Sequence, residues 1–193
     1  MLIEAPILIG PVRVGKTTVS ALLAKHLDVP HVSLDAIRLR YYHEIGYDEE
    51  HARQLRETGG FLAVYRYWKP FEAYAVERVL TEHWGSVIDF GAGHSVQDDP
   101  VLLARIQRAL AACANVVLLL PSPDPAASIR ILRERLGPFE SDGIDFHAYF
   151  VQHPANRQLV PLTVYTAGQS PEQTCAEILH RMRRQAPQAG PPT

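Results

Sequence analysis

The sequence predicts a three-layer α/β/α fold, in which a five-stranded parallel sheet lies between two layers of helices. Short apolar runs alternate with segments that carry apolar residues at helical spacing, which is typical of βαβ units. The first apolar run leads directly into a glycine-rich loop and then a helical pattern, an arrangement common in α/β proteins. At 193 residues the chain has room for one such domain, which we place at residues 1–185.

The strands and helices are expected in the following order. Strands are expected at the five apolar runs, residues 2–9, 30–34, 86–90, 115–120 and 162–166. Helices are expected where apolar residues recur with a helical period, at residues 16–28, 36–46, 49–57, 61–84, 99–113, 125–136, 146–152 and 171–185. In the first helix, for example, Val19, Leu23 and Leu27 lie on one face.

Several helices carry start or break signals. Asp99-Pro100 and Asp124-Pro125 each place a capping carboxylate before a proline at the first helical position. Ser170-Pro171-Glu172-Gln173 has the pattern of a capping box. Pro70 lies inside the segment 61–84 and is expected to kink that segment or to split it into two helices.

Composition narrows the class of protein. The formal net charge of −2 gives no general attraction for nucleic acid or for an anionic membrane. The longest strongly apolar run, residues 116–120, is far shorter than the roughly 20 residues of a membrane span, and the N-terminus lacks the basic segment of a signal peptide. We expect a cytoplasmic monomer or homodimer that acts on a small molecule.

Residues 137–145, with glycines and a proline, are expected to form a mobile lid, and the tail 186–193 is expected to be disordered.

The glycine-rich loop predicts the first half of the chemistry. The run Gly10-Pro11-Val12-Arg13-Val14-Gly15-Lys16-Thr17 matches the phosphate-binding pattern GxxxxGK[ST]. Its backbone amides, together with Thr18, are expected to cradle the phosphates of ATP, while Lys16 reaches the β- and γ-phosphate oxygens. The Thr17 hydroxyl is a candidate ligand of Mg²⁺. ATP and Mg²⁺ are therefore the expected cofactors.

Polar residues follow the third strand. Asp89 ends this strand and is a candidate Mg²⁺ carboxylate, or alternatively a cap of the following turn. Gly91, Ala92 and Gly93 then form a turn at the carboxyl end of the strand, where open α/β sheets bind ligands. The turn is a candidate acceptor contact or a simple tight connection. His94 is a candidate contact to the acceptor or a solvated loop side chain.

Further charged residues complete the expected site. Asp35 ends the second strand and is a candidate to take the proton of an acceptor hydroxyl, or to cap the next helix. Arg38, one turn later, is a candidate to bind an anionic group of the acceptor. Arg133 and Arg135 precede the lid and are candidates to contact adenine or the γ-phosphate, or form a solvated basic helix end. Arg157 follows the lid and could complete this cationic clamp.

These features resemble shikimate kinases and their relatives in the nucleoside-monophosphate-kinase group of P-loop proteins. The resemblance extends to Leu179 and rests on residues 10–17, Asp35, Phe90-Gly91-Ala92-Gly93, the arginines before 137–145, Val164-Tyr165-Thr166 and the segment 168–172. It implies a P-loop NTPase fold with sheet order 2-3-1-4-5 and transfer of the γ-phosphoryl group of ATP to a hydroxyl of a small acceptor. It also places Thr166, Gly168, Gln169 and Ser170 near the adenine.

The sequence departs from this family mainly in the acceptor site. Ser33 stands where shikimate kinases usually have the first aspartate of Asp-x-Asp, and Ala92 interrupts their three glycines. Their Phe-Arg pair, whose arginine grips the shikimate carboxylate, corresponds to Phe71-Glu72, and a glutamate repels a carboxylate. The lid lacks the Arg-Pro-Leu-Leu signature. Arg66 or Lys69 is a candidate replacement for the missing arginine.

Three alternatives to a small-molecule kinase differ in what they require. A nucleotide or nucleoside kinase needs arginines that bind the acceptor's phosphate. Arg38, Arg40 and Arg66 are candidates for this role, so this alternative remains. An ATP-dependent regulatory or binding protein would use the nucleotide to order the lid. A nucleic-acid-handling ATPase is disfavoured by the absence of a basic stripe.

Overall fold

The computed structural model describes residues 4–185, and its sheet confirms the predicted fold class. The strands of the main sheet are β1 (Ile7–Ile9), β2 (His31–Ser33), β3 (Val87–Asp89), β4 (Val116–Leu120) and β7 (Leu162–Tyr165). The helices are α1 (Lys16–Leu27), α2 (Leu34–Glu44), α3 (Glu49–Glu82), α4 (Pro100–Leu110), α5 (Pro125–Leu136), α6 (Phe146–Gln152), α7 (Pro154–Gln158) and α8 (Pro171–Gln185), with a 3₁₀ turn η1 (Ala92–Ser95). The expected tail, 186–193, lies outside the described residues. Between residues 4 and 185, no helix is long and apolar enough to cross a membrane.

The main sheet is parallel, with strand order β2-β3-β1-β4-β7. This is the expected order 2-3-1-4-5, because β5 (Glu140–Ser141) and β6 (Ile144–Asp145) pair antiparallel with each other and not with the main sheet. The register places Leu8 of β1 opposite Asp89 on one side and Val117 on the other. The carboxyl ends of the central strands therefore lie together at one edge of the sheet.

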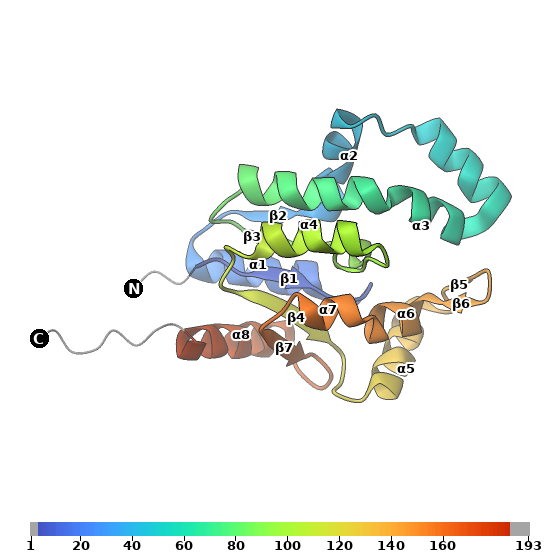
Figure 1. The fold of residues 1–193 in the computed structure, drawn as a ribbon. Coiled ribbons are helices and arrows are strands. Elements are labelled where there is room, and N and C mark those ends of the chain that lie inside the picture. Colours follow the sequence, from blue (N-terminus) through green and yellow to red (C-terminus); the bar gives the residue numbers. More distant parts are fainter. Residues whose placement is uncertain (1–3, 186–193) are drawn as a thin grey trace, which may run out of the picture.

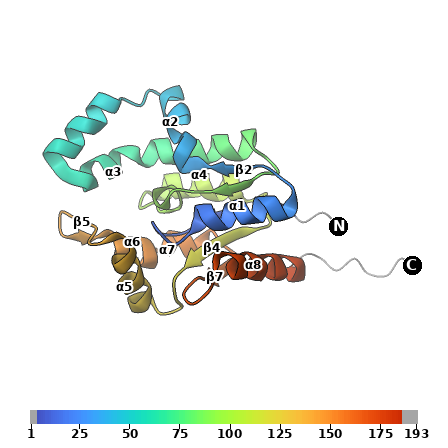
Figure 2. The ribbon, with the colours of Figure 1, turned by 180° about the vertical axis from the view of Figure 1, so that it is seen from behind.

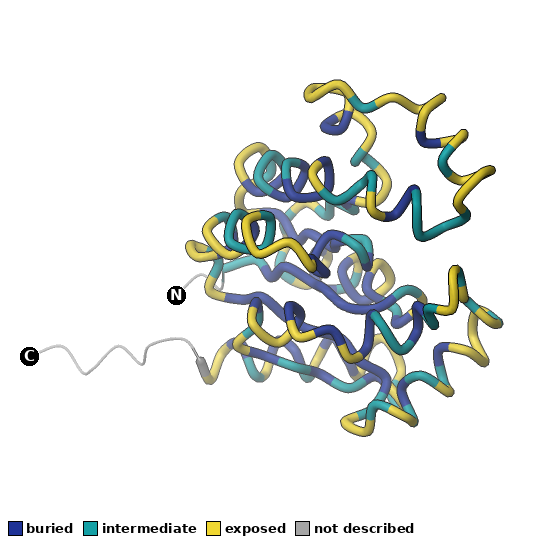
Figure 3. The backbone as a smooth tube through the Cα atoms, turned by 45° about the vertical axis from the view of Figure 1, so that its right-hand side comes forward, coloured by how far each residue is buried: buried dark blue, intermediate teal, exposed yellow. Residues whose placement is uncertain are grey.

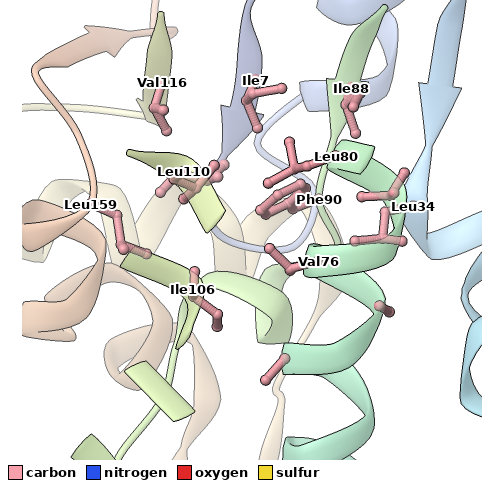
Figure 4. Packing of buried hydrophobic residues seen from close by; sticks show 14 of the residues in the cluster. Ile7, Leu34, Val76, Leu80, Ile88, Phe90, Ile106, Leu110, Val116 and Leu159 are labelled. Atoms are coloured by element: carbon pink, nitrogen blue, oxygen red, sulfur yellow. The ribbon is translucent and has the colours of Figure 1, made fainter. Parts of the chain in front are cut away.

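Helices cover both faces of the sheet (Figures 1 and 2). Side chains alternate between the faces along each strand, so Ile7 and Ile9 pack with α3 and α4, as Figure 4 shows for Ile7, Val76 and Ile106. Leu8 packs in a second cluster, with α1 and α8. Along the tube in Figure 3 the three central strands, β1, β3 and β4, are buried, whereas β2 is only partly buried and the outer faces of the helices are exposed. Hydrophobic burial on both faces accounts for the continuous apolar character of the strands.

The predicted helix starts are confirmed. The Asp99 carboxylate accepts hydrogen bonds from the first amides of α4, and that of Asp124 does the same in α5. Ser170 and Gln173 bond reciprocally at the start of α8, as a capping box requires. The short helix α7 was not expected, although it too begins with a capped Pro, after His153.

The long helix α3 breaks at Gly59 and Gly60, between the two helices expected at 49–57 and 61–84. Gly60 has φ +66°, in the left-handed region that favours glycine. Pro70 does not split the helix, and the residues around it keep helical φ and ψ angles. The break, rather than the proline, produces the bend of α3 seen in Figure 1.

The hairpin of β5 and β6 lies within the predicted lid and contacts the bend of α3. The Leu62 amide donates a hydrogen bond to Ser141 Oγ at 3.2 Å, and the ring centroids of Phe61 and Phe139 lie 4.8 Å apart. Lid and bend thus meet at the edge of the molecule that carries the carboxyl ends of the strands. That the lid is mobile stays a prediction.

Candidate functional site

The phosphate-binding loop connects β1 to α1, which begins at Lys16. The Lys16 ammonium is buried and donates hydrogen bonds to the carbonyl oxygens of Gly10 and Pro11, both at 2.9 Å. Burial lowers the pKa of Lys16 to about 8, while the charges of Asp89 and Asp35 act to raise it. The lysine is thus held inside the curl of the loop, with two carboxylates near enough to influence it.

The Asp89 carboxylate, at the end of β3, is the centre of a buried polar cluster. Thr17 Oγ1 donates to Asp89 Oδ1 at 2.9 Å, Ser33 Oγ donates to the same oxygen at 3.2 Å, and His31 Nε2 lies 2.7 Å from Oδ2. In the described part of the chain, the side-chain bonds of Asp89 go to these three groups, so the alternative that it caps the next turn is wrong. A hydroxyl beside a carboxylate fits Mg²⁺, which commonly takes few protein oxygens and completes its shell with phosphate and water.

A cavity of about 470 Å³ adjoins the loop and extends below the lid. Val12 of the loop borders this cavity, and Asp35 and Arg38 line it from the first turns of α2. We call it the acceptor cavity because these two residues are the ones expected to contact an acceptor. The Asp35 side chain is 55% exposed and forms an ion pair with Arg38. Because Ser33 is the N-cap residue of α2, the alternative that Asp35 caps this helix is wrong. The carboxylate is therefore free of a capping role and reachable from the cavity.

The glycine turn after β3 forms another part of the cavity wall and rests on a buried ion pair. Ala92 and Gly93 line the cavity, as does Glu72 of α3. Lys69 pairs with Glu72 and donates to the carbonyl oxygens of Gly93 and Val96 at 3.1 and 3.0 Å. A Cβ on Gly93 would lie 2.2 Å from Glu72 Oε1, so a larger residue here would force the Glu72 carboxylate to move. The turn thus forms part of the cavity wall, and its contact with an acceptor stays a prediction.

His94 is buried in this wall, so its alternative as a solvated loop residue is wrong. Its Nε2 lies 3.5 Å from the Tyr42 hydroxyl, and its Nδ1 lies 3.3 Å from the carbonyl oxygen of Gly91. Burial lowers the pKa of His94, although Glu72 and Asp35 act to raise it. Burial thus favours the neutral form of the ring. Gly91 itself does not line the cavity but packs against the Asp35 carboxylate.

The three arginines of the expected clamp have different surroundings. Arg135 Nη1 donates to the carbonyl oxygen of Arg13 at 3.2 Å, so this side chain reaches the phosphate-binding loop. Arg133 Nη2 lies 2.8 Å from Asp145 Oδ2, at the base of the lid hairpin. Arg157 is exposed on α7 and does not line the acceptor cavity. The structure thus brings one of the three to the loop.

The turn between β7 and α8 contains the residues expected near adenine: Thr166, Gly168, Gln169 and Ser170. Ser170 is used in the capping box with Gln173, and Gln169 is hydrogen-bonded to side chains of α8. Thr166 is buried, and its amide donates to a carbonyl oxygen of β4. Their contact with the base stays a prediction.

The comparisons with known proteins give a result at the level of the fold. No family model matches the chain, and no curated protein matches it. Among solved structures, a shikimate kinase from Acinetobacter baumannii in complex with shikimate covers 95% of each chain with a TM-score of 0.62 and 16% identity. The chain has the shikimate kinase fold.

Two further solved structures share this fold. The shikimate kinase from Aquifex aeolicus has a TM-score of 0.59 and 19% identity, over 94% of this chain and 98% of that one. A gluconokinase from Sinorhizobium meliloti has a TM-score of 0.52 and 14% identity, over 96% and 95%. The resemblance expected from the sequence is confirmed for the shikimate kinase fold, and the sequence is distant from all three proteins.

Sequence reasoning missed the aromatic wall of the cavity. Phe61, Tyr65 and Trp68 line it from α3, and Phe139 and Phe150 line it from the lid and α6. The signal for the first three was present, because residues 61, 65 and 68 share one face of a helix. The lid and α6 aromatics carry no such local signal.

Proposed function

We propose that the protein is an ATP-dependent kinase that transfers the γ-phosphoryl group of ATP to a hydroxyl of a small acceptor. One observation carries the proposal: the cavity that contains Asp35 is bordered by Val12 of the phosphate-binding loop. A hydroxyl bound there would lie next to the terminal phosphate of a nucleotide bound by the loop. The shared fold with shikimate kinases and a gluconokinase supports the proposal.

The chain's own residues divide the work. The loop amides and Lys16 hold the β- and γ-phosphates. Asp35 takes the proton of the acceptor hydroxyl. The hydroxyl oxygen bonds to the γ-phosphorus while the bond from that phosphorus to the β–γ bridging oxygen breaks, which leaves ADP. Arg135, at the loop, stabilises the charge on the transferring group, with Arg133 and Arg157 as further candidates. The turn from Thr166 to Ser170 adjoins the base.

Thr17 and Asp89 would hold Mg²⁺, directly or through water. When bound, the ion would supply positive charge that neutralises the phosphate oxygens. Ser33 and His31 orient the Asp89 carboxylate through the contacts described above.

A screen of hydroxylated compounds with Mg²⁺ and ADP tests the proposal. We expect an acceptor to raise the melting temperature by mass action, and the same compound to raise ADP release from ATP above the rate without acceptor. Shikimate and gluconate belong in the panel, and release equal to the no-acceptor control excludes each of them. Tight nucleotide binding with slow, unstimulated hydrolysis across the panel would instead indicate a regulatory or binding protein.

Nucleotide affinity is expected to fall as the pH rises above about 8. Below its lowered pKa of about 8, Lys16 is already protonated and ready to bind phosphate oxygens. Above it, the free protein has lost that proton and must regain it on binding, so the affinity falls by up to about tenfold per pH unit. Phosphate itself ionises near pH 6 and does not titrate in this range. Calorimetry of Mg²⁺ and ADP binding at pH 7, 8 and 9, in buffers of different ionisation enthalpy, measures the affinity and the proton uptake. Equal affinity at the three pH values would contradict the expectation.

A further inference from the structure

The acceptor cavity has two walls of aromatic rings. Phe61, Tyr65 and Trp68 line it from α3, and Phe139 and Phe150 line it from the lid and α6. Phe61 packs edge-on against neighbouring rings and tilted against Phe139, whose centroid lies 4.8 Å away. Such walls bind flat apolar ligands by burying area and by ring contacts.

The charged groups of the cavity leave no free cation for an anionic acceptor. Among the described residues that line it, Arg38 is the single lysine or arginine, against the two carboxylates of Asp35 and Glu72. Arg38 is already paired with Asp35, and its guanidinium carbon lies 5.6 Å from the centroid of the Trp68 ring. Lys69 is bound to Glu72 and to backbone carbonyls and does not line this cavity.

The arginines that would recognise a phosphorylated acceptor lie elsewhere. Arg66 lines a separate cavity of about 560 Å³ between α3, α4 and α6, as does Lys69. Arg40 is paired with Glu82. Because both carboxylates of the acceptor cavity are already paired with a cation, a nucleotide's phosphate there, like a carboxylate, would find no unpaired cation among the described lining residues.

We infer that the acceptor is an alcohol with a flat apolar or aromatic body, neutral or bearing an ammonium group, and without a carboxylate or phosphate. This rests on the proposed function, because it names the acceptor class of the same site. Glu72 sets the selection. Its Oε2 is held by Lys69, while its Oε1 lies against Gly93 in the cavity wall. There it can accept a hydrogen bond from a hydroxyl or ammonium, whereas a ligand carboxylate would be buried beside it with no unpaired cation among the described lining residues.

Three small compounds with the same phenyl ring and the same benzylic hydroxyl test the inference. They are 1-phenylethane-1,2-diol, protonated 2-amino-1-phenylethanol and mandelate, which differ in carrying a neutral, a cationic and an anionic group. Ligand-observed NMR with the full chain, Mg²⁺ and ADP gives the dissociation constants. We expect the diol and the amino alcohol to bind at least about tenfold more tightly than mandelate or shikimate.

Two variants locate the binding and its selectivity. Phe139→Ala should weaken binding of the diol by about tenfold, whereas Trp84→Ala, which removes an aromatic side chain that is 58% exposed and outside the cavity, should not. Glu72→Gln should reduce the preference over mandelate to about threefold or less. Because Glu72→Gln leaves Lys69 without its partner, the melting temperature of this variant is compared with that of the wild type. Phe139→Ala, which leaves this ion pair intact, tests the site independently.

The outcomes separate this inference from the proposed function. Tighter binding of mandelate or shikimate than of the diol, or no binding of any phenyl compound, overturns the inference while nucleotide binding and ADP release still test the kinase. If Mg²⁺ and ADP do not bind, the kinase proposal fails, and the order of affinities for the phenyl compounds, measured without nucleotide, still decides the inference.

Discussion

A Lys16→Met variant is expected to lower kcat/KM for phosphoryl transfer by about 10²- to 10³-fold, the usual cost of removing one charged group that stabilises a transferring phosphoryl. Methionine has nearly the same length and volume as the lysine stem, but it cannot donate to phosphate oxygens. Wild-type Lys16 already lies inside the loop, bonded to Gly10 and Pro11 carbonyls. The substitution should therefore lower the rate of phosphoryl transfer, and steady-state ADP release with a validated acceptor measures this change.

The same variant separates a catalytic from a structural role. Burial already disfavours the charged form of Lys16, as its lowered pKa shows, so replacing the ammonium by an apolar group should not lower the melting temperature by more than about 4 °C. Lys25→Met, at an exposed position on the same helix, is the matched control and should keep full activity. Retention of kcat/KM within twofold in Lys16→Met would overturn the role given to this residue.

Features with a local cause could be predicted from the sequence. The capping of α4, α5 and α8 depends on neighbouring residues, so Asp99, Asp124 and Ser170 gave reliable helix starts. The phosphate-binding loop is likewise contiguous, and Asp89 was found because it ends a recognisable strand. Its contact with Thr17, 72 positions away in the sequence, follows from the parallel pairing of β1 with β3.

The acceptor side depends on contacts that no local pattern encodes. Glu72 looks like a mere departure from a family motif until the fold places it against Gly93 and Lys69. His94 lies in a loop by sequence, yet packing against Tyr42 and Phe90 buries it. Pro70 outranks glycine as a helix breaker in propensity, but the bend occurs at Gly60 because the chain there needs a positive φ.

An Asp35→Asn variant is expected to lower kcat by about 10²- to 10⁴-fold, the usual range for removing a general base, while the affinity for Mg²⁺ and ADP stays within about twofold. Asparagine keeps the shape of the side chain but cannot take the acceptor's proton. Because Asp35 lies on the cavity side of Val12 and makes no hydrogen bond to the phosphate-binding loop among the described contacts, nucleotide binding should be spared.

Rates and nucleotide affinity together decide what Asp35 does. Asp28→Asn is the matched control: it makes the same change at an exposed residue whose φ of 54° asparagine tolerates, and it should leave both quantities unchanged. If Asp35 only positioned Arg38 through their ion pair, the loss would appear mainly in the acceptor KM, and an Arg38→Ala variant would reproduce it. A proton acceptor instead predicts a loss in kcat that Arg38→Ala does not reproduce. An unchanged kcat in Asp35→Asn would move the base to another residue of the cavity.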